Sequence, residues 1–430
     1  MLKLSSSDRN FERKMSKLLD RGPYTREIEE QAKKIIDAVA KRGDSAVARF
    51  AKKFDAVELK TTRFKVSKRE IDAAKKAVPA IRKKAINTAI GNVALFAAKG
   101  MPSSWTFSPR PGVTLGERFT PIERVAVYIP GGAAPLVSTV AHTAAVAKAA
   151  GVPEIVAATP PGPKGRVLPE ILYALDRCGV KEIYRLGGVY AVAALALGTD
   201  TIRKVDKIVG PGNAYVSAAK KIVSGDLVGI DMVAGPSEVM VVADSTADPE
   251  IVAADLLSQI EHGSGRERAV LLTTSSRLVA KTEKALRRRA AGIASSSPAV
   301  AKALDEGVCL VRVPSVAKAV EIANKYAPEH LELMCAKAKS VSKLITAAGA
   351  VFIGQWTPEP IGDFVAGPSH VLPTGGTARF AGGLTTADFL RRTSVLEYTR
   401  KALRREAAAA MALADMEGLE AHGDSVKARL

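Results

Sequence analysis

Residues 256–263, LLSQIEHG, pair an amide and an imidazole near what the sequence predicts to be the end of a helix. The apolar residues of this stretch fall on one stripe, which is typical of an amphipathic helix. Gln259 and His262 are three positions apart, so their side chains would leave the helix on the same side, one turn apart. Such a pair suits a metal site, but an ordinary polar helix end before the helix-stopping Gly263 has the same pattern.

The chain contains only five histidines, so the surroundings of each one are informative. His330 stands beside Glu329 just after a proline, and a neighbouring imidazole and carboxylic acid can act as a general acid/base pair near neutral pH. An exposed loop pair is the alternative interpretation. His142 falls in a predicted alanine-rich helix and His370 in a loop shaped by prolines, and neither is assigned a catalytic role.

Four residues that are distant in the sequence could together form a metal site: Gln259, His262, Asp363 and His422. They supply two imidazoles, a carboxylate and an amide oxygen, a mixed set that suits Zn²⁺ or a similar divalent ion with positions left open for substrate. The set contains no thiolate, which favours a catalytic or substrate-holding metal over a structural one. Taken alone, His422 near the C-terminus would be a solvated tail residue.

The elements that must position these residues follow an alternation of strands and helices. Strand-like apolar runs that end in glycine or proline turns alternate with alanine-rich helical segments, which is the βαβ pattern of parallel sheets. The runs form two series, and the sequence therefore predicts two α/β units in succession. The first series starts at residues 124, 154, 182 and 207, and the second at residues 237, 268, 308 and 349.

Helical patterns lie at both ends of this alternation. Residues 26–54 have apolar residues at helical spacing, with a break at Gly43 that predicts two helices, and residues 68–99 continue in the same style. After Thr385 the sequence becomes helical to the end. No complete GxGxxG motif follows a strand, although glycine-rich strand ends such as the one at Gly210 can still cradle phosphates at a helix start.

Bulk composition places the chain among ordinary globular proteins. With 430 residues, 47% hydrophobic and 25% charged, it has the length of roughly two to four structural units. No apolar run approaches the length of a membrane span, and the N-terminus lacks the apolar segment of a secretory signal. The three scattered cysteines form no CxxC pair, which fits a reducing compartment. We therefore expect a cytoplasmic protein without a membrane partner.

The net charge of +19 and the pI near 9.8 raise the question of nucleic-acid binding. Lysines and arginines are spread along the chain, however, and aromatic residues make up only 5%, so stacking platforms for bases are not expected. We predict no nucleic-acid partner. A positive field would still help to attract an anionic dinucleotide.

Seven motifs resemble those of the histidinol dehydrogenase family. In chain order they are YIPGG (128–132), VGPGNAYV (209–216), DMVAGPSEV (231–239), DLLSQIEHG (255–263), APEHLEL (327–333), GDFVAGPSHVLPTGGTAR (362–379) and LEAH (419–422). The likeness covers nearly the whole chain, and the long central motifs are highly specific.

The resemblance implies a cytoplasmic homodimer with one zinc ion per subunit. It implies the oxidation of L-histidinol to L-histidine through an aldehyde, in two hydride transfers to two NAD⁺, as the last step of histidine biosynthesis. The expected fold is α/β, with two Rossmann-like parallel-sheet units that lack GxGxxG and interlock across the dimer. The expected divisions are an N-terminal helical extension (1–23), a larger α/β domain (24–127 with 238–384), a dinucleotide-binding domain (128–237) and a helical tail that reaches the partner subunit (385–430).

The resemblance also implies roles for individual residues. The catalytic pair would be Glu329 and His330, and the dinucleotide contacts would be Tyr128, Tyr190 and Asn213. The zinc ligands would be Gln259, His262, Asp363 and His422, the last of them from the partner subunit. The substrate contacts would be Ser237, Gln259, His262, His330, Asp363, Glu417 and His422. Among these, Glu417 is suited to hold the substrate's ammonium group.

The implied chemistry agrees with these residue types. His330 would take the hydroxyl proton in the first oxidation. The second oxidation needs water added to the aldehyde, because only a hydrate can lose a hydride to give an acid, and Glu329 would be the base for that water. A bound zinc ion would orient the substrate for hydride transfer.

Two single positions and one short stretch depart from the family pattern. Tyr190 replaces a glutamine that commonly contacts the dinucleotide, Ser369 replaces an asparagine, and residues 96–100 lack the family's histidine and glutamine. None of these changes removes a metal ligand or the acid/base pair. Two alternatives stay open: a related dehydrogenase of another alcohol, such as a sulfonated diol, and a basic nucleic-acid-binding protein. Glu417 speaks against a sulfonate because two negative charges would repel each other.

Overall fold

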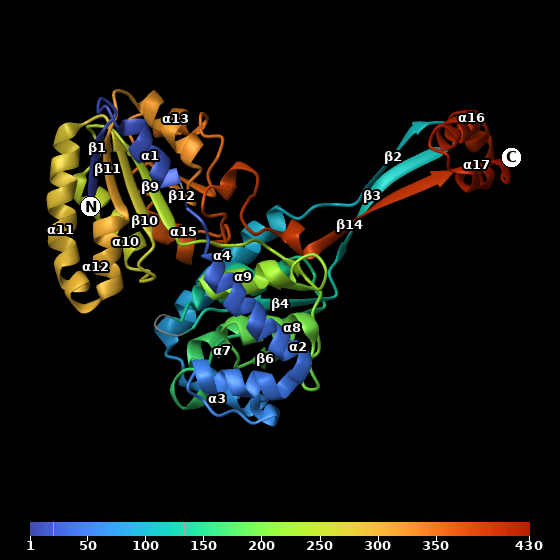
Figure 1. The fold of residues 1–430 in the computed structure, drawn as a ribbon, viewed down its shortest axis with the longest axis horizontal. Coiled ribbons are helices and arrows are strands. Elements are labelled where there is room, and N and C mark those ends of the chain that lie inside the picture. Colours follow the sequence, from blue (N-terminus) through green and yellow to red (C-terminus); the bar gives the residue numbers. More distant parts are fainter. Residues whose placement is uncertain (20, 132–134) are drawn as a thin grey trace.

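The structure of the protein, a computed structural model, describes residues 1–19, 21–131 and 135–430. The ribbon consists of two α/β bodies and a long arm that ends in the C-terminal helices (Figure 1). Each body is built around a parallel sheet, and the arm around an antiparallel one. The mixed α/β fold with parallel sheets, predicted from the alternating pattern, is confirmed.

The first body contains a six-stranded parallel sheet with the order β1-β11-β10-β9-β12-β13. Connections run outward in both directions from the boundary between β9 and β12, so this boundary is the topological switch point of the sheet. The strands are β1 (Leu2–Ser5), β9 (Glu238–Ala243), β10 (Arg268–Thr273), β11 (Val308–Arg312), β12 (His330–Met334) and β13 (Ala350–Ile353).

Helices cover both faces of this sheet because alternate residues of each central strand enter opposite cores. Val239 and Val241 face the core that holds α10 (Pro249–Ile260), α11 (Ser276–Ser296) and α12 (Pro298–Glu306). Met240 and Val242 face the core that holds α1 (Phe11–Leu19), α13 (Val316–Tyr326) and α14 (Ala338–Ser342).

The second body contains a five-stranded parallel sheet with the order β6-β5-β4-β7-β8, whose switch point lies between β4 and β7. The strands are β4 (Arg124–Tyr128), β5 (Glu154–Ala158), β6 (Glu182–Tyr184), β7 (Lys207–Val209) and β8 (Gly229–Ile230). One face packs against α2 (Arg26–Phe54), α8 (Gly188–Leu197) and α9 (Ala214–Val223). The other face packs against α3 (Lys68–Ala77), α4 (Ala80–Lys99), α5 (Ser138–Val140), α6 (Val146–Ala149) and α7 (Pro169–Arg177).

The arm is a three-stranded antiparallel sheet with β3 in its centre. Its strands are β2 (Trp105–Arg110), β3 (Val113–Pro121) and β14 (Leu390–Tyr398), followed by α16 (Arg400–Met416) and α17 (Glu420–Lys427) at the tip. Large apolar side chains on the arm are exposed, namely Phe107 at 51%, Leu396 at 68% and Met416 at 77%. Exposed apolar surface of this kind marks a site of association.

The domain boundaries in the structure differ from those expected. The resemblance places residues 24–127 with 238–384, but α2, α3 and α4 pack on the five-stranded sheet because their apolar faces fill its two cores. The ends 1–23 and 385–430, expected to be helical, also contain strands β1 and β14. Both strands pair with distant segments, β11 and β3, which helical or strand periodicity does not reveal.

The predicted break in the first long helical segment is confirmed. Gly43 interrupts α2 with φ of 49° and ψ of −131°. A positive φ is accessible to glycine without the steric cost that a Cβ atom brings. The chain therefore bends at this glycine, and both halves of α2 contribute residues to one core.

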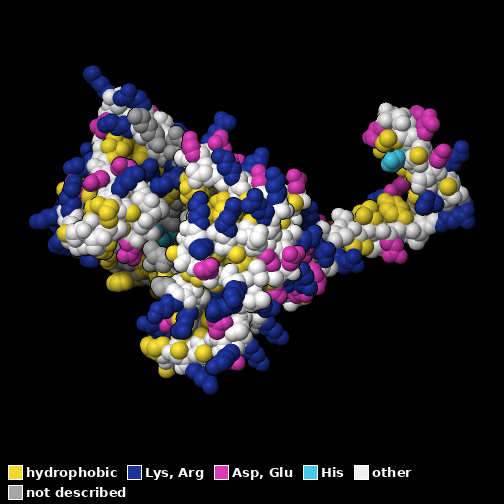
Figure 2. Space-filling model, turned by 60° about the horizontal axis from the view of Figure 1, so that its bottom comes forward, with side chains coloured by type: hydrophobic (Ala, Val, Ile, Leu, Met, Phe, Trp, Pro, Cys, Tyr) yellow, Lys and Arg dark blue, Asp and Glu magenta, His cyan; other side chains and the backbone are white. Residues whose placement is uncertain are grey.

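The surface carries mixed charge on the face in Figure 2, where lysine and arginine side chains are spread over both bodies with acidic side chains among them. This distribution agrees with the even spacing of basic residues in the sequence. Among the described helices, none is both long enough and apolar enough to span a membrane.

Arg185 joins α3 to the five-stranded sheet through an ion pair. Its side chain is 2% exposed, and its guanidinium donates to the two carboxylate oxygens of Glu70 at 2.9 and 2.8 Å. These hydrogen bonds lower the pKa of Glu70 from 4.5 to about 2. The pair therefore stabilises the fold above the ordinary pKa of a glutamate, and the contribution is lost as the pH falls through the lowered pKa.

Glu70→Gln should lower the free energy of unfolding by about 2 kcal/mol at neutral pH, because Arg185 would stay buried without its counter-charge. The partial exposure of Glu70 keeps the loss below that of a fully buried pair. Urea unfolding of the variant and the parent should give free energies that converge as the pH is lowered from about 5 toward 2. The control is Glu58→Gln, at an exposed carboxylate. A difference that does not change with pH would contradict the role of this ion pair.

Candidate active site

Glu329 and His330 lie at the amino end of β12, beside the switch point of the six-stranded sheet. His330 is the first residue of β12 and pairs with Val239 of β9. Both side chains are buried, with residue exposures of 6% for Glu329 and 3% for His330. The alternative interpretation of this pair as an exposed loop is therefore wrong.

The orientation of the His330 ring follows from two acceptors at Nδ1. This atom lies 3.0 Å from the backbone oxygen of Glu238 and 3.1 Å from Oε1 of Gln259. Since both neighbours are acceptors, Nδ1 carries a proton in this arrangement. The other ring nitrogen, Nε2, faces Oδ1 of Asp363 at 3.5 Å and Oε1 of Glu359 at 3.8 Å.

Glu329 is held by the backbone of the neighbouring strand. Its Oε2 accepts a hydrogen bond from the N–H of Glu238 at 2.8 Å and lies 3.7 Å from Nδ1 of His330. Burial raises the pKa of Glu329 to about 8. A carboxylic acid with such a pKa can exchange protons near neutral pH. Ser237, the predicted substrate contact, directly precedes Glu238 and is partly exposed.

Negative charge surrounds the His330 ring. Burial alone would lower the pKa of His330, but the carboxylates of Glu329, Asp363 and Glu359 outweigh burial and raise this pKa to about 10. Burial, together with Asp363, raises the pKa of Glu359 to about 8. A divalent cation beside these three carboxyl groups would favour their ionised forms, because it would supply positive charge in a buried site.

Nitrogen and oxygen donors in this cluster are close enough to share one cation. One ligand atom from each of His330, Glu359 and Asp363 lies within 4.8 Å of the other two. Gln259 is completely buried, and its Nε2 has no hydrogen-bond partner among the described residues; the same holds for Nε2 of His330 and Oε1 of Glu359. Burying a polar atom without a partner costs free energy. A cation would offset this cost for Oε1 of Glu359 and for Nε2 of a neutral His330, because both can donate an electron pair to a metal ion. These donors therefore fit a divalent metal ion.

Glu359 is a candidate site residue that the sequence interpretation missed. It lies on α15 (Glu359–Phe364), one turn before Asp363, so the two carboxylates emerge on the same side of the helix. The N–H of Glu359 donates to Oε1 of the buried Glu332 at 2.8 Å, which ties the start of α15 to β12. The spacing of two acidic residues four positions apart was the available signal.

His370 holds the end of the helix that carries Asp363. Its Nδ1 donates to the backbone oxygen of Asp363 at 3.0 Å, and its Nε2 lies 3.2 Å from the hydroxyl of Thr139. The ring stacks on that of His142 with a centroid distance of 4.2 Å. Burial lowers the pKa of His142 to about 3, so this second ring packs as a neutral group. Both histidines support the position of the Asp363 backbone.

The remaining predicted metal ligands, His262 and His422, and the predicted substrate contact Glu417 occupy different positions relative to this cluster. His262 lies just beyond α10, one turn after Gln259, and is exposed. Glu417 and His422 lie at the tip of the arm, far from the cluster in the same chain (Figure 1). Within one chain, therefore, the structure gathers Gln259 and Asp363 around His330 and leaves both arm residues outside the site.

At the carboxyl edge of the five-stranded sheet, the backbones that follow β4 and β7 come close together at the switch point. Tyr128 ends β4, and Gly210 follows β7 with φ of 118°, where a Cβ atom would collide with the Tyr128 backbone oxygen. Asn213 caps α9 by accepting hydrogen bonds from two N–H groups of its first turn at 3.0 and 3.1 Å. Ligands of open parallel sheets bind at such edges. The motif residue Gly132 lies outside the described residues.

Tyr190 points into the core of the second body. It is 1% exposed, and its ring lies 6.5 Å from that of Phe50 in a stacked arrangement. Its hydroxyl donates to the carboxylate of Asp55 and accepts a hydrogen bond from the N–H of Gly187 at 3.2 Å. The hydroxyl therefore caps the start of its own helix, and both of its hydrogen bonds are made inside the chain.

Tyr190→Phe should lower the free energy of unfolding by about 1–3 kcal/mol, because Asp55 and the Gly187 N–H would each lose a buried partner. The dissociation constant of NAD⁺ should change by less than about twofold, since the hydroxyl is turned inward. Urea unfolding and fluorescence titration with NAD⁺ measure the two effects. Tyr215→Phe, at a side chain that is 38% exposed, is the control. Unchanged stability with a large loss of NAD⁺ affinity would show that Tyr190 contacts the dinucleotide instead.

Comparison with known proteins connects this geometry to one family. The family model described as histidinol dehydrogenase matches residues 21–430. A histidinol dehydrogenase of Gluconobacter oxydans (strain 621H) is 43% identical over 431 residues, which cover 100% of this chain and 99% of the relative. One of Rhizobium meliloti (strain 1021) is 44% identical over 430 residues, covering 100% and 98%.

A solved structure gives the same result at the level of the fold. The crystal structure of histidinol dehydrogenase from Elizabethkingia anophelis superposes with a TM-score of 0.91 at 35% identity, covering 100% of this chain and 98% of that one. The chain therefore belongs to the histidinol dehydrogenase family, whose members are NAD-dependent oxidoreductases of histidine biosynthesis.

Proposed function

We propose that the protein oxidises L-histidinol to L-histidine through the aldehyde, using two NAD⁺ and one zinc ion per subunit. The observation that carries this proposal is the buried Glu329–His330 pair, whose imidazole shares one cluster with the carboxyl groups of Glu359 and Asp363. A tuned acid/base pair suits the removal of protons from an alcohol and from water. The proposal of L-histidinol as the substrate follows from membership of the histidinol dehydrogenase family.

Gln259, His262 and Asp363 would hold the zinc ion together with His422 of the partner subunit. The proximity of Gln259 and Asp363 to the two ring nitrogens of His330 supports this assignment, as does the position of His262 one turn beyond Gln259. When bound, the zinc ion would orient the imidazole and the amine of the substrate for hydride transfer. Mixed nitrogen and oxygen ligands suit this ion.

His330 would accept the hydroxyl proton of L-histidinol at Nε2 while the carbinol hydrogen leaves as a hydride to NAD⁺. The contact of Nδ1 with the Glu238 backbone oxygen supports this choice, because it leaves Nε2 as the free ring nitrogen. A nearby divalent cation would lower the pKa of His330 from its raised value toward the neutral form that a base requires.

Glu329 would deprotonate the water that adds to the aldehyde. The resulting hydrate has one remaining C–H bond at this carbon, and its loss as a hydride to the second NAD⁺ gives the carboxylic acid. The burial of Glu329 and its raised pKa support a role in this proton transfer. Ser237 would hold the substrate together with Glu417 of the partner subunit. The carboxylate of Glu417 of the partner subunit would pair with the ammonium group of the substrate.

The unit formed by residues 128–237 would bind the dinucleotide, with Tyr128 and Asn213 at the carboxyl edge of its sheet. The strand order and the glycine turns at this edge support a Rossmann-like unit of non-standard sequence. Tyr190 would support this edge by capping α8 at Gly187. The residues 238–384 would supply the metal and catalytic groups.

The protein would act as a homodimer whose arms cross between subunits. Three observations support this proposal: the arm projects away from both bodies, it carries exposed apolar side chains, and its tip holds Glu417 and His422. A second copy would bury the apolar surface and bring the two polar residues to the donor cluster.

Turnover of L-histidinol should yield two NADH per substrate, and a chelator should abolish the reaction until zinc is restored. Both outcomes can be measured by NADH absorbance with limiting L-histidinol. Glu329→Gln should lower the overall rate by roughly 10²–10³-fold and release aldehyde, since only the second oxidation needs this base.

Glu58→Gln, at an exposed site on the second body, is the matched control and should leave the yield unchanged. One NADH per substrate from the parent protein would contradict the role given to Glu329. If a zinc-loaded dimer failed to oxidise L-histidinol, the proposed substrate would be wrong.

Co-expression of His262→Ala with His422→Ala should restore activity that neither variant has alone. Random pairing produces hybrid dimers in which one site has all its ligands, so the mixture should reach about a quarter of the parent activity. The zinc content of the purified hybrid gives an independent measure of the completed site. If both ligands belonged to the same subunit, no mixture would recover activity.

A further inference from the structure

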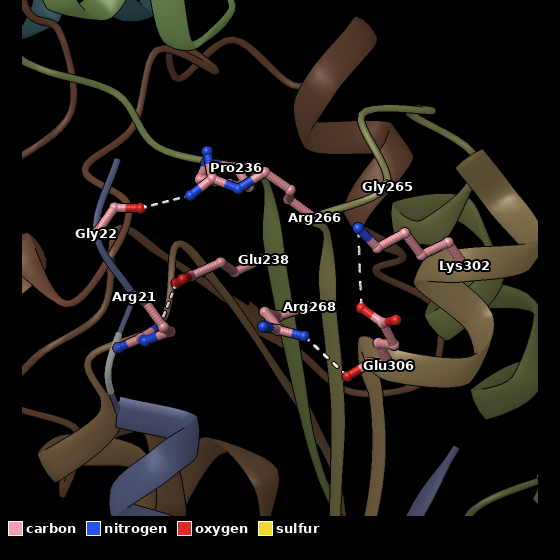
Figure 3. Close-up of a pocket in the computed structure, with 9 residues that line it drawn as sticks. All are labelled: Arg21, Gly22, Pro236, Glu238, Gly265, Arg266, Arg268, Lys302 and Glu306. Carbon is pink, nitrogen blue, oxygen red and sulfur yellow. Dashed lines mark hydrogen bonds and ion pairs between the residues drawn. The ribbon is translucent and has the colours of Figure 1, made fainter. Parts of the chain in front are cut away.

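A polar cavity lies at the amino edge of the six-stranded sheet, apart from the dinucleotide edge of the other body. Its volume is about 290 Å³, at the small end of the range for ligand pockets. The segment before α2, the amino ends of β9 and β10, and α12 enclose it (Figure 3). Its lining residues are Arg21, Gly22, Pro236, Glu238, Gly265, Arg266, Arg268, Lys302 and Glu306. We call it the arginine cavity.

The side chains of the arginine cavity carry an excess of positive charge. Three arginines and Lys302 face two carboxylates, so the lining has two uncompensated positive charges. Arg21 pairs with Glu238, and Lys302 lies 4.0 Å from Glu306. The charges of Arg266 and Arg268 therefore remain without an acidic partner in the cavity.

Backbone carbonyl groups hold these guanidinium groups in place. Arg266 donates to the backbone oxygens of Gly22 and Pro23 at 2.9 and 3.1 Å. Arg268 donates from Nη1 to the backbone oxygen of Glu306 at 2.8 Å. A carbonyl fixes the position of a cation without neutralising its charge, so the site is preorganised for an anion.

Arg21 gives the cavity a buried wall. Its side chain is 4% exposed, and its guanidinium lies 3.5 Å from the ring centroid of Tyr326 while it donates to Glu238 and to the Tyr326 backbone oxygen. Its Nε is buried and has no hydrogen-bond partner among the described residues. Buried donors are almost always paired, so Arg21 has one N–H group whose hydrogen bond is not made within the described residues.

We propose that the arginine cavity binds a small phosphate-bearing anion. Planar guanidinium groups match the geometry of phosphate oxygens and can bind them with paired hydrogen bonds. Two uncompensated positive charges suit the double charge of a phosphate group at neutral pH, and the small volume limits the ligand to inorganic phosphate or a compact phosphate ester. The proposal concerns binding and does not depend on the reaction that the protein catalyses.

The test is isothermal titration calorimetry of the zinc-loaded full chain at constant ionic strength. Inorganic phosphate and ribose 5-phosphate are titrated separately, so that the free ion and an ester are distinguished. Arg268→Gln with Lys302→Gln should raise the dissociation constant at least about tenfold, because two cationic contacts to the phosphate are lost. Lys302→Gln alone, at an exposed side chain, should give a smaller increase.

The matched control is Arg277→Gln with Lys284→Gln, which removes the same charge from exposed positions of α11. It should leave both dissociation constants within about twofold of the parent. Tighter binding of the ester would assign an organic group to the cavity, and equal binding would assign the free ion. Equal weakening in both double variants, or no saturable binding by the parent, would overturn the proposal.

Discussion

The parallel register between β9 and β12 is the constraint on which the candidate active site depends. With His330 opposite Val239, the backbone of Glu238 accepts a hydrogen bond from His330 and donates one to Glu329. A slip of one residue would turn His330 to the other face of the sheet, away from Gln259. The same slip would exchange the residues that fill the two cores. The hydrophobic packing and the geometry of the candidate site therefore require the same register.

The candidate sites of the two bodies lie at opposite edges of their sheets. In the second body, Tyr128 and Gly210 lie at the carboxyl ends of strands, where ligands of open parallel sheets usually bind. In the first body, His330 begins its strand, so the acid/base pair lies at the amino edge. This placement lets α10 and α15 bring Gln259 and Asp363 to the pair. The proposed sites therefore follow the general rule for parallel sheets in one body and depart from it in the other.

Strand and helix alternation and the break at Gly43 could be predicted from the sequence, because each depends on local periodicity or on residue type. Glu329 and His330 could be singled out as neighbouring ionisable residues, but their burial could not be predicted from the local sequence. The packing of α2 to α4 on the five-stranded sheet could not, since an amphipathic helix does not encode which sheet it covers. The position of Glu359 beside His330 could not be predicted, because it depends on the path of the chain between β13 and α15. The inward direction of Tyr190 depends on Asp55, which is distant in the sequence.

The strand order of the arm has a consequence for folding during synthesis. β3 is the central strand of the arm, yet its partner β14 belongs to the last part of the chain. During synthesis, the β2–β3 hairpin therefore leaves the ribosome with one edge of β3 unpaired, and such edges recruit foreign strands. Folding of the arm must wait until β14 has been synthesised. The edge of β3 that β14 covers in the folded protein is therefore open for as long as β14 has not left the ribosome.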